Sequence, residues 1–366
     1  MKKITFISTS FTPSMAANSV NVMKISDAFQ LSGCDVQLLS FTNKNQEIVD
    51  LYTYYDTETK FKIKKYKHSP LYYIKSVLFA KKSKSSLVYT RHPLIAYLST
   101  KLRMNTIIHA HGEFNSNIHK WALMGALKSK YLKKFCIASN GLKDVYLEQY
   151  AKYSHKMEMI SNGVSLKRYR NPISMKEARD AIGYQDHRRL LVYSGSLLRG
   201  RGIEIILDIA KEMKDFSFYV VGGSDEQIQD LKKIASNNVN FVGYVENREV
   251  YKYLIAADYL LMPYQKEIEI IGGTTNGELI RPLKMFEYIA ASKPIIASDL
   301  IGLRDVLNDE ECIFVSSDNP NEWISAISYL DKNLNSVNRM KDKLAIKKLK
   351  YDNLIIVSQI LEGIIL

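Results

Sequence analysis

The stretch RPLKMFEYIAASKP, residues 281–294, says most about the fold of this chain. Pro282 suits the first turn of a helix, where its missing N–H is not needed. Apolar residues then recur at helical spacing and are expected to face a core: Leu283, Phe286, Ile289 and Ala290. Lys293-Pro294 ends the helix, and PIIAS at 294–298 reads as a buried parallel strand. A helix that leads into such a strand is typical of α/β folds.

One carboxylate, Glu287, lies inside this apolar pattern. The amides and the dipole at a helix N-terminus favour phosphate, and a carboxylate a turn and a half further on can bind the hydroxyls of a ribose. The segment therefore fits a sugar nucleotide. The alternative is an amphipathic helix whose Glu287 is simply solvated, which so short a motif does not exclude.

Length and cysteine content narrow the class of protein. The 366 residues predict two domains. Cys34, Cys136 and Cys312 lie far apart without metal-like spacing, which favours a reducing compartment and no disulfides. There is no signal peptide after Met1 and no run of 18 apolar residues, so we expect a cytoplasmic chain without a membrane span.

The charge of the chain is unevenly distributed. Residues 1–170 contain 27 Lys and Arg against 10 Asp and Glu, a net charge of +17, whereas the remainder has a net charge of −4. In residues 60–84, lysines alternate with apolar and aromatic residues, a mixture that suits an anionic membrane surface. We predict peripheral membrane association through this half, with a solvated basic surface as the alternative. No nucleic-acid motif is present, and no nucleic-acid partner is expected.

The chain contains two series of alternating strands and helices. Strands of the first series are expected at 4–8, 35–41, 85–91, 105–111 and 135–140, with a helix at 20–33 that Ser19 can cap. Strands of the second are expected at 190–195, 217–223, 239–245, 258–264 and 294–299, with a helix at 202–213. Each series predicts a doubly wound parallel sheet, which binds its ligands beyond the carboxyl ends of the strands.

The alternation breaks at Asn162-Gly163-Val164, where we place the link between the domains. The predicted boundaries are 1–165 for an N-terminal domain, 166–345 for a C-terminal domain, and 346–366 for a last segment. That last segment reads as one helix that crosses back to pack on the N-terminal domain.

Several motifs occur in the order and spacing of one family. They are NGV at 162–164, YSGSLLRGRGIEIIL at 193–207, VVGGS at 220–224, FVGYV at 241–245, AADYLLMPY at 256–264 and RPLKMFEYIAASKPIIAS at 281–298. In these motifs the chain resembles the retaining glycosyltransferases of family 4, the glycosyl transferases of group 1. The resemblance implies a GT-B fold, in which two doubly wound Rossmann-like domains face each other across a cleft.

The resemblance assigns the donor nucleotide to the C-terminal domain. It implies that Glu287 binds the two ribose hydroxyls and that Arg201 binds the diphosphate. Gly195 would let the backbone approach the phosphates, and Leu283 and Lys284 would offer helix amides to them. For the Lys284 side chain, simple solvation is the alternative. Two further motif residues are expected to line the donor site: Gly243 and Tyr264.

Two positions depart from the family pattern. Ser196 stands where many members have a second Arg, and Arg199 is the candidate to supply the missing charge, with a solvated loop cation as the alternative. The family's paired glutamates, E-x7-E, have Leu279 at the first position. Glu278, one residue earlier, is the candidate replacement, with reading of the sugar by amides around Gly272 and Gly273 as the alternative.

The N-terminal domain is implied to hold the acceptor. His111, at the end of a buried strand, resembles the family's histidine near the transferred sugar. We interpret His109 as structural. Asn18 and Arg91 follow other strands of this domain, and Glu113 follows the same strand as His111; all three are candidate acceptor ligands.

The implied activity is transfer of a hexose or N-acetylhexosamine, with retained configuration, from a UDP- or GDP-sugar to a glycan or lipid-linked acceptor. The catalytic residues would be His111, Arg201 and Glu287, with no cofactor and no metal. Synthesis of bacterial surface polysaccharide or lipopolysaccharide is the expected setting. Two alternatives stay open: a catalytically weak nucleotide-sugar-binding protein, and a nonhydrolysing sugar-nucleotide 2-epimerase.

Overall fold

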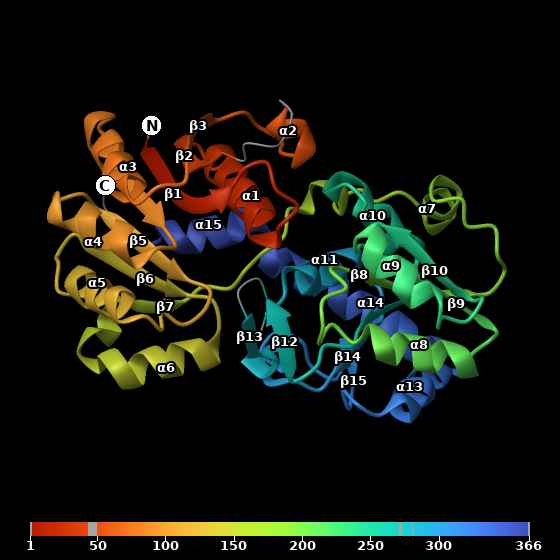
Figure 1. Cartoon of the computed structure of the whole chain (residues 1–366). Coiled ribbons are helices and arrows are strands. Elements are labelled where there is room, and N and C mark those ends of the chain that lie inside the picture. Colours follow the sequence, from red (N-terminus) through yellow and green to blue (C-terminus); the bar gives the residue numbers. More distant parts are fainter. Residues whose placement is uncertain (1, 43–49, 271–272, 280, 365–366) are drawn as a thin grey trace. The chain divides into compact units, whose positions relative to one another are not determined.

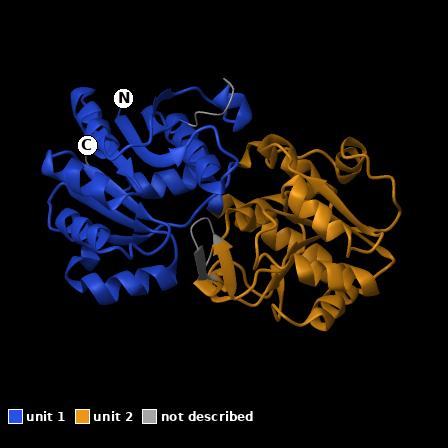
Figure 2. Cartoon of the chain, in the orientation of Figure 1, with its two compact units in different colours: residues 1–165, 351–366 blue, residues 166–350 orange. Residues whose placement is uncertain are grey.

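The computed structural model describes residues 2–42, 50–270, 273–279 and 281–364. The chain forms two compact units (Figure 2). Unit 1 consists of residues 1–165 and 351–366, and unit 2 of residues 166–350. No helix in the described ranges combines the length and the apolar character needed to cross a membrane.

Unit 1 is built on a seven-stranded parallel sheet in the order β3-β2-β1-β4-β5-β6-β7 (Figure 1). The strands are β1 (Lys3–Phe11), β2 (Asp35–Phe41), β3 (Lys62–Tyr66), β4 (Leu87–Thr90), β5 (Thr106–Ala110), β6 (Leu132–Ile137) and β7 (Met157–Met159). The chain runs outward from β1 through β2 to β3, then returns to β4 and continues the other way. The strand order therefore reverses between β1 and β4.

Helices cover both faces of this sheet. They are α1 (Ala17–Leu31), α2 (Leu51–Tyr54), α3 (Leu71–Lys82), α4 (Pro93–Lys101), α5 (Asn117–Leu127), α6 (Asn140–Tyr150), η1 (Ala151–Lys156) and α15 (Asn353–Leu361). Neighbouring strand residues point to opposite faces. Leu38 packs in the core under α1 and α15, whereas Leu39 packs in the core under α3 and α4.

Unit 2 contains a second parallel sheet, in the order β10-β9-β8-β11-β14-β15, and an antiparallel pair, β12-β13. The strands are β8 (Arg189–Ser194), β9 (Phe216–Val221), β10 (Val239–Gly243), β11 (Tyr259–Met262), β12 (Glu267–Ile270), β13 (Gly273–Asn276), β14 (Ile295–Ser298) and β15 (Cys312–Val315). The helices are η2 (Leu166–Arg168), α7 (Met175–Ala181), α8 (Ile203–Glu212), α9 (Asp225–Lys232), α10 (Asn247–Ala256), η3 (Gly277–Leu279), α11 (Leu283–Ala291), α12 (Ile301–Arg304), α13 (Pro320–Lys332), α14 (Leu334–Lys347) and η4 (Lys348–Tyr351). The prediction of two doubly wound α/β sheets is confirmed.

Two local predictions were wrong. The last segment is not one helix: α14 ends at Lys347, and α15 begins only after Asp352, whose side chain accepts a hydrogen bond from the Leu354 amide as an N-cap. Ser19 does not cap its helix either, because α1 already begins at Ala17. The Ser19 hydroxyl instead donates to the carbonyl of Phe11 at 2.8 Å.

Candidate functional site

The strand order of unit 2 reverses between β8 and β11. In doubly wound sheets, ligands bind beyond the carboxyl ends of the strands at such a point. Two segments leave the sheet there, residues 195–201 after β8 and residues 263–264 after β11. Both contain residues that were predicted to bind the donor.

Glycines line the edge of the sheet beside this point. The Gly195 amide donates to the carbonyl of Val221 at 2.8 Å, and the Gly222 amide donates to the carbonyl of Gly243 at 2.7 Å. A Cβ atom on Gly222 would lie 2.1 Å from the carbonyl oxygen of Gly195. The backbone of Gly195 occupies the space that a side chain at Gly222 would need, so only glycine fits there.

Helix α11 is fixed to the same point by Tyr288. The Tyr288 hydroxyl accepts from the Ser194 amide at 2.9 Å and donates to the carbonyl of Leu261 at 3.2 Å. The helix begins after Pro282 without a side-chain cap. The Met285 amide donates to the carbonyl of Pro282 at 3.1 Å, and no N-cap side chain satisfies the amides before it.

Lys284, in the first turn of α11, is buried at this point rather than solvated. Its ammonium lies 3.6 Å from the ring centroid of Tyr193 and 4.6 Å from that of Tyr264. Its Nζ atom has no hydrogen-bond partner among the described residues. Burial, followed by the charge of Arg201, lowers the pKa of Lys284 well below its ordinary value, while Glu287 acts in the opposite direction.

Arg201 brings a second cation to the cluster. Its guanidinium lies 5.1 Å from the ring centroid of Tyr264, and its Nη2 donates to the carbonyl of Glu269 at 3.4 Å. Its Nε is buried without a partner in the described ranges, where neither Arg201 nor Lys284 forms an ion pair. Two unneutralised cations, an uncapped helix and glycine-lined strand ends together form a site for an anion.

The other predicted donor residues of unit 2 are less closely tied to this cluster. Glu287 is partly exposed on α11 and close enough for its charge to raise the pKa of Tyr169, after the larger effect of burial. Leu283 is partly exposed, and the exposed Ser196 accepts from the Tyr193 hydroxyl at 2.7 Å through its carbonyl. Arg199 is exposed, and its amide donates to the Glu269 carboxylate at 3.2 Å.

Glu278 lies in η3, where its carboxylate is 3.8 Å from the ammonium of Lys266. Gly272, named in the alternative reading, lies outside the described residues.

In unit 1 the strand order reverses between β1 and β4, and Arg91 directly follows β4. Its Nη1 donates to the Asn18 side-chain oxygen at 2.8 Å, and its Nη2 donates to that of Asn21. The Asn18 amide group in turn donates to the hydroxyl of Ser10 at 2.7 Å. Asn18 and Arg91 are therefore brought together, as two candidate acceptor ligands should be. Asn21 was not predicted, because nothing distinguishes it in the sequence from other polar residues of α1.

His111 follows the neighbouring strand β5 and is exposed, with its ring centroid 4.3 Å from that of His109. His109 is buried, and its two ring nitrogens contact the Tyr89 hydroxyl at 2.7 Å and the carbonyl of Ile160 at 2.9 Å. The structural interpretation of His109 agrees with these contacts. Glu113 is exposed, in a loop that the Tyr146 hydroxyl holds by donating to the carbonyl of Gly112 at 2.9 Å.

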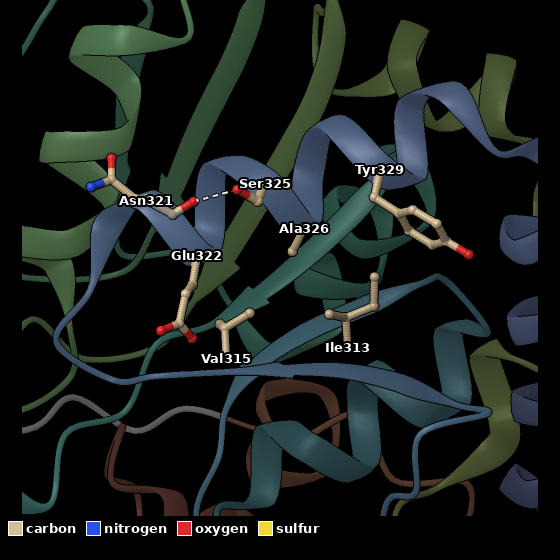
Figure 3. Close-up of a pocket in the computed structure, with 7 residues that line it drawn as sticks. All are labelled: Ile313, Val315, Asn321, Glu322, Ser325, Ala326 and Tyr329. Carbon is tan, nitrogen blue, oxygen red and sulfur yellow. Dashed lines mark hydrogen bonds between the residues drawn. The ribbon is translucent and has the colours of Figure 1, made fainter.

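A pocket of about 530 Å³ lies elsewhere in unit 2, between β15 and α13 (Figure 3). It is lined by Ile313, Val315, Asn321, Glu322, Ser325, Ala326 and Tyr329. None of the predicted site residues lines it. No cluster of three or more His, Cys, Asp or Glu side chains in the described part of the chain could hold a metal ion.

The sequence of unit 2 matches a known family. Residues 188–333, which include the glycine-lined edge, Arg201 and α11, match the family model described as glycosyl transferases group 1. Over this range, the sequence of unit 2 is similar to the group 1 glycosyltransferases. A curated relative, the putative teichuronic acid biosynthesis glycosyltransferase TuaH of Bacillus subtilis, is 24% identical over 176 residues, which are 47% of this chain and 41% of TuaH. The chain thus matches about two fifths of that relative's length.

Solved structures share the fold of the whole chain. A glycosyltransferase from Rickettsia africae superposes with a TM-score of 0.75 at 15% identity and 100% coverage of both chains. Anabaena HepE, solved in complex with UDP and glucose, superposes with a TM-score of 0.74 at 15% identity and 99% coverage of both. The prediction of a GT-B glycosyltransferase fold with two Rossmann-like domains is confirmed.

Proposed function

We propose that this protein is a retaining glycosyltransferase that takes a hexose or N-acetylhexosamine from a UDP- or GDP-sugar. The observation that carries the proposal is the buried ammonium of Lys284, which lacks a hydrogen-bond partner in the described ranges and lies beside Arg201 at the start of α11. A buried cation without a partner is costly. A diphosphate would neutralise it and would also satisfy the helix amides.

The same groups would serve the chemistry. As the sugar leaves, negative charge develops on the diphosphate, and preorganised cations stabilise that charge where water is excluded. Lys284, Arg201 and the α11 amides would carry this role without a metal or cofactor. Glu287 would hold the ribose, and the departing phosphate would accept the acceptor's proton on the same face of the sugar. His111 would bind a sugar hydroxyl as a neutral imidazole.

The names of similar proteins support the setting. TuaH is named for teichuronic acid biosynthesis, and HepE was solved with UDP and glucose. We propose that this chain likewise acts in the synthesis of a bacterial surface polysaccharide, on a glycan or lipid-linked acceptor. Its place of action would be the inner face of the cell membrane, reached from the cytoplasm.

The first test is nucleotide binding and turnover by the full chain. UDP and GDP are titrated by calorimetry, and a panel of UDP- and GDP-sugars is incubated with crude glycan and lipid extracts while released nucleotide diphosphate is measured. We expect release from one donor, and an NMR spectrum of the product with the anomeric configuration of that donor. Donor binding without release would favour a binding protein, and recovery of an epimerised sugar would favour a 2-epimerase.

Matched variants locate the site. Arg201→Ala and Glu287→Ala should each weaken nucleotide binding, whereas Lys232→Met, an exposed lysine of α9, should not. If nucleotide binding survives both site changes, the assignment of the donor site is wrong.

A further inference from the structure

No ion pair neutralises the guanidinium of Arg91 within the described residues of unit 1. Its two hydrogen-bond partners, the Asn18 and Asn21 side chains, are uncharged amides. Within the described part of the chain it forms no ion pair, and its Nε is buried without a hydrogen bond. Partly buried arginines usually face a carboxylate. This one is held in position by two amides and keeps its charge uncompensated.

The segment of chain around Arg91 contains no acid. The sequence has no Asp or Glu between Glu58 and Glu113, a stretch that contains both β4 and Arg91 itself. Burial lowers the pKa of Arg91, and the Tyr89 phenol acts in the opposite direction. Burial and the charge of Arg91 together lower the pKa of His109 to about 3, so this ring is neutral and offers no opposite charge.

The position of Arg91 is that of a ligand-binding residue. It follows β4 at the reversal of the strand order, beside the N-terminal turn of α1. That helix is 15 residues long and has no side-chain cap at Ala16. An uncapped helix N-terminus and an unneutralised guanidinium therefore face the same end of the sheet, and both favour an anion.

We propose that the acceptor carries an oxyanion, a phosphate or a carboxylate, and that Arg91 binds it. This inference rests on the proposed transferase function and adds the chemical class of the acceptor. Asn18 and Asn21 act as positioning residues that hold the guanidinium in place. The donor diphosphate does not need Arg91, because Lys284 and Arg201 supply two cations for it in unit 2. A neutral acceptor would leave the charge of Arg91 uncompensated in the complex.

The test uses two pairs of probes with the full-length chain saturated with UDP or GDP. Methyl β-D-glucuronide is compared with methyl β-D-glucoside, and geranyl diphosphate with geraniol. We expect the affinity of one anionic probe to be at least about 10-fold higher than that of its neutral partner. The first pair identifies a uronic acid as the source of the anion, and the second a lipid-linked phosphate. If both anionic probes bind no better than their neutral partners, the proposal is overturned.

Variants tie the preference to Arg91. Arg91→Gln should abolish it, whereas Arg103→Gln, which removes the same charge from an exposed position of unit 1, should preserve it. Nucleotide binding by unit 2 should be unchanged in both variants, which separates a failure of this inference from a failure of the proposed function. Loss of nucleotide affinity in Arg91→Gln, with the anion preference intact, would mean that Arg91 serves the donor and would overturn the proposal.

If Arg91→Gln does not fold, Asn18→Ala can test instead whether Arg91 causes the preference for the anionic probe. Asn18 is exposed, and its truncation leaves the charge in place but releases one side of the guanidinium. We expect a loss of about 3- to 10-fold in affinity for the anionic probe, with that for the neutral probe unchanged. An unchanged preference in Asn18→Ala would then contradict the positioning role and the proposal with it.

Discussion

Lys284 combines a positive charge with burial. Its ammonium is buried against the rings of Tyr193 and Tyr264, and the attraction of a cation to aromatic faces offsets part of the cost of desolvation. The aromatic faces cannot replace the hydrogen bonds that water would have given. A diphosphate bound there, as proposed, would compensate the free energy that remains.

Lys284→Met should therefore separate binding from stability. We expect affinity for UDP or GDP to fall by about 10- to 100-fold, because a charge-assisted hydrogen bond in a buried site is lost. The free energy of unfolding should stay the same or rise, because an unpaired buried charge is removed. Calorimetric titration and thermal unfolding measure the two effects. A variant that loses stability as well as affinity would mean that Lys284 has a structural role.

Nucleotide binding should also be coupled to proton uptake. The pKa of Lys284 is lowered in the empty site, first by burial and then by Arg201, and a bound diphosphate would raise it again. Above the lowered pKa, a fraction of the protein molecules have a neutral Lys284, and these molecules take up a proton when the diphosphate binds. Titrations in buffers of different ionisation enthalpy, from neutral to alkaline pH, should show an uptake that grows with pH in the wild type and is absent in Lys284→Met.

At the scale of single residues, the sequence pointed to candidate binding residues but not to their burial or their contacts. Arg201 and Glu287 could be predicted because they occur in a series of family motifs. The burial of Lys284 could not, because the helical pattern alone does not say that Tyr288 fixes α11 against β8 and β11. Asn21 was missed because its role depends on a long-range contact with Arg91.

A second buried lysine, Lys293, follows the end of α11 and has a different consequence. Ser292 ends the helix in a left-handed conformation, with φ of 53°. Lys293, next along the chain, is 8% exposed. Burial, with a further effect of Lys341, lowers its pKa from 10.5 to about 8. The folded state therefore disfavours the charged form of this side chain.

Lys293→Met should stabilise the protein at neutral pH. Below pH 8, Lys293 is charged in both the folded and the unfolded protein. Burial of this charge destabilises the folded state by about 3 kcal/mol at most. Between pH 8 and 10.5 the unfolded state binds more protons, so the stability of the wild type rises with pH relative to the variant. Urea unfolding at pH 7 and pH 10 should give a difference that shrinks at the higher pH. A constant difference would assign the effect to packing.

The central strands and the edge strand β10 could be predicted, but the edge strands β3 and β15 could not. Buried on both faces, β1, β2, β4 and β5 have continuous apolar runs that stand out in the sequence. The edge strand β3 reads KIKKY and is largely exposed, so it lacks that pattern. Edge strand β15 and the hairpin of β12 and β13 were missed for a related reason. Their pairing depends on the tertiary structure rather than on a run of apolar residues.

Over the whole molecule, positive charge and exposed apolar side chains coincide in unit 1. Helix α3 exposes Leu71, Ile74 and Leu78 beside lysines of the same helix and of β3. Apolar side chains among cations favour insertion at the surface of an anionic bilayer, where each basic residue adds about 1 kcal/mol. This surface is the candidate membrane contact.

Liposome sedimentation tests that contact. The chain should bind vesicles of phosphatidylglycerol and phosphatidylcholine, and binding should fall as salt is added. The triple change Leu71→Ser, Ile74→Ser and Leu78→Ser should reduce binding. Leu334→Ser, Ile346→Ser and Leu349→Ser, which remove equally exposed apolar side chains of unit 2, should not. Equal effects of the two triple variants would rule out a membrane contact specific to α3.

The return of the chain to unit 1 has a consequence for biosynthesis. Helix α15 places Ile356, Val357 and Ile360 in the core under α1, yet the ribosome makes these residues only after all of unit 2. Unit 2, which is continuous in sequence, can thus fold first. Unit 1, although synthesised earlier, keeps an apolar face uncovered until α15 has been made. During that interval the nascent chain presents a binding surface to chaperones, and the late arrival of α15 closes it.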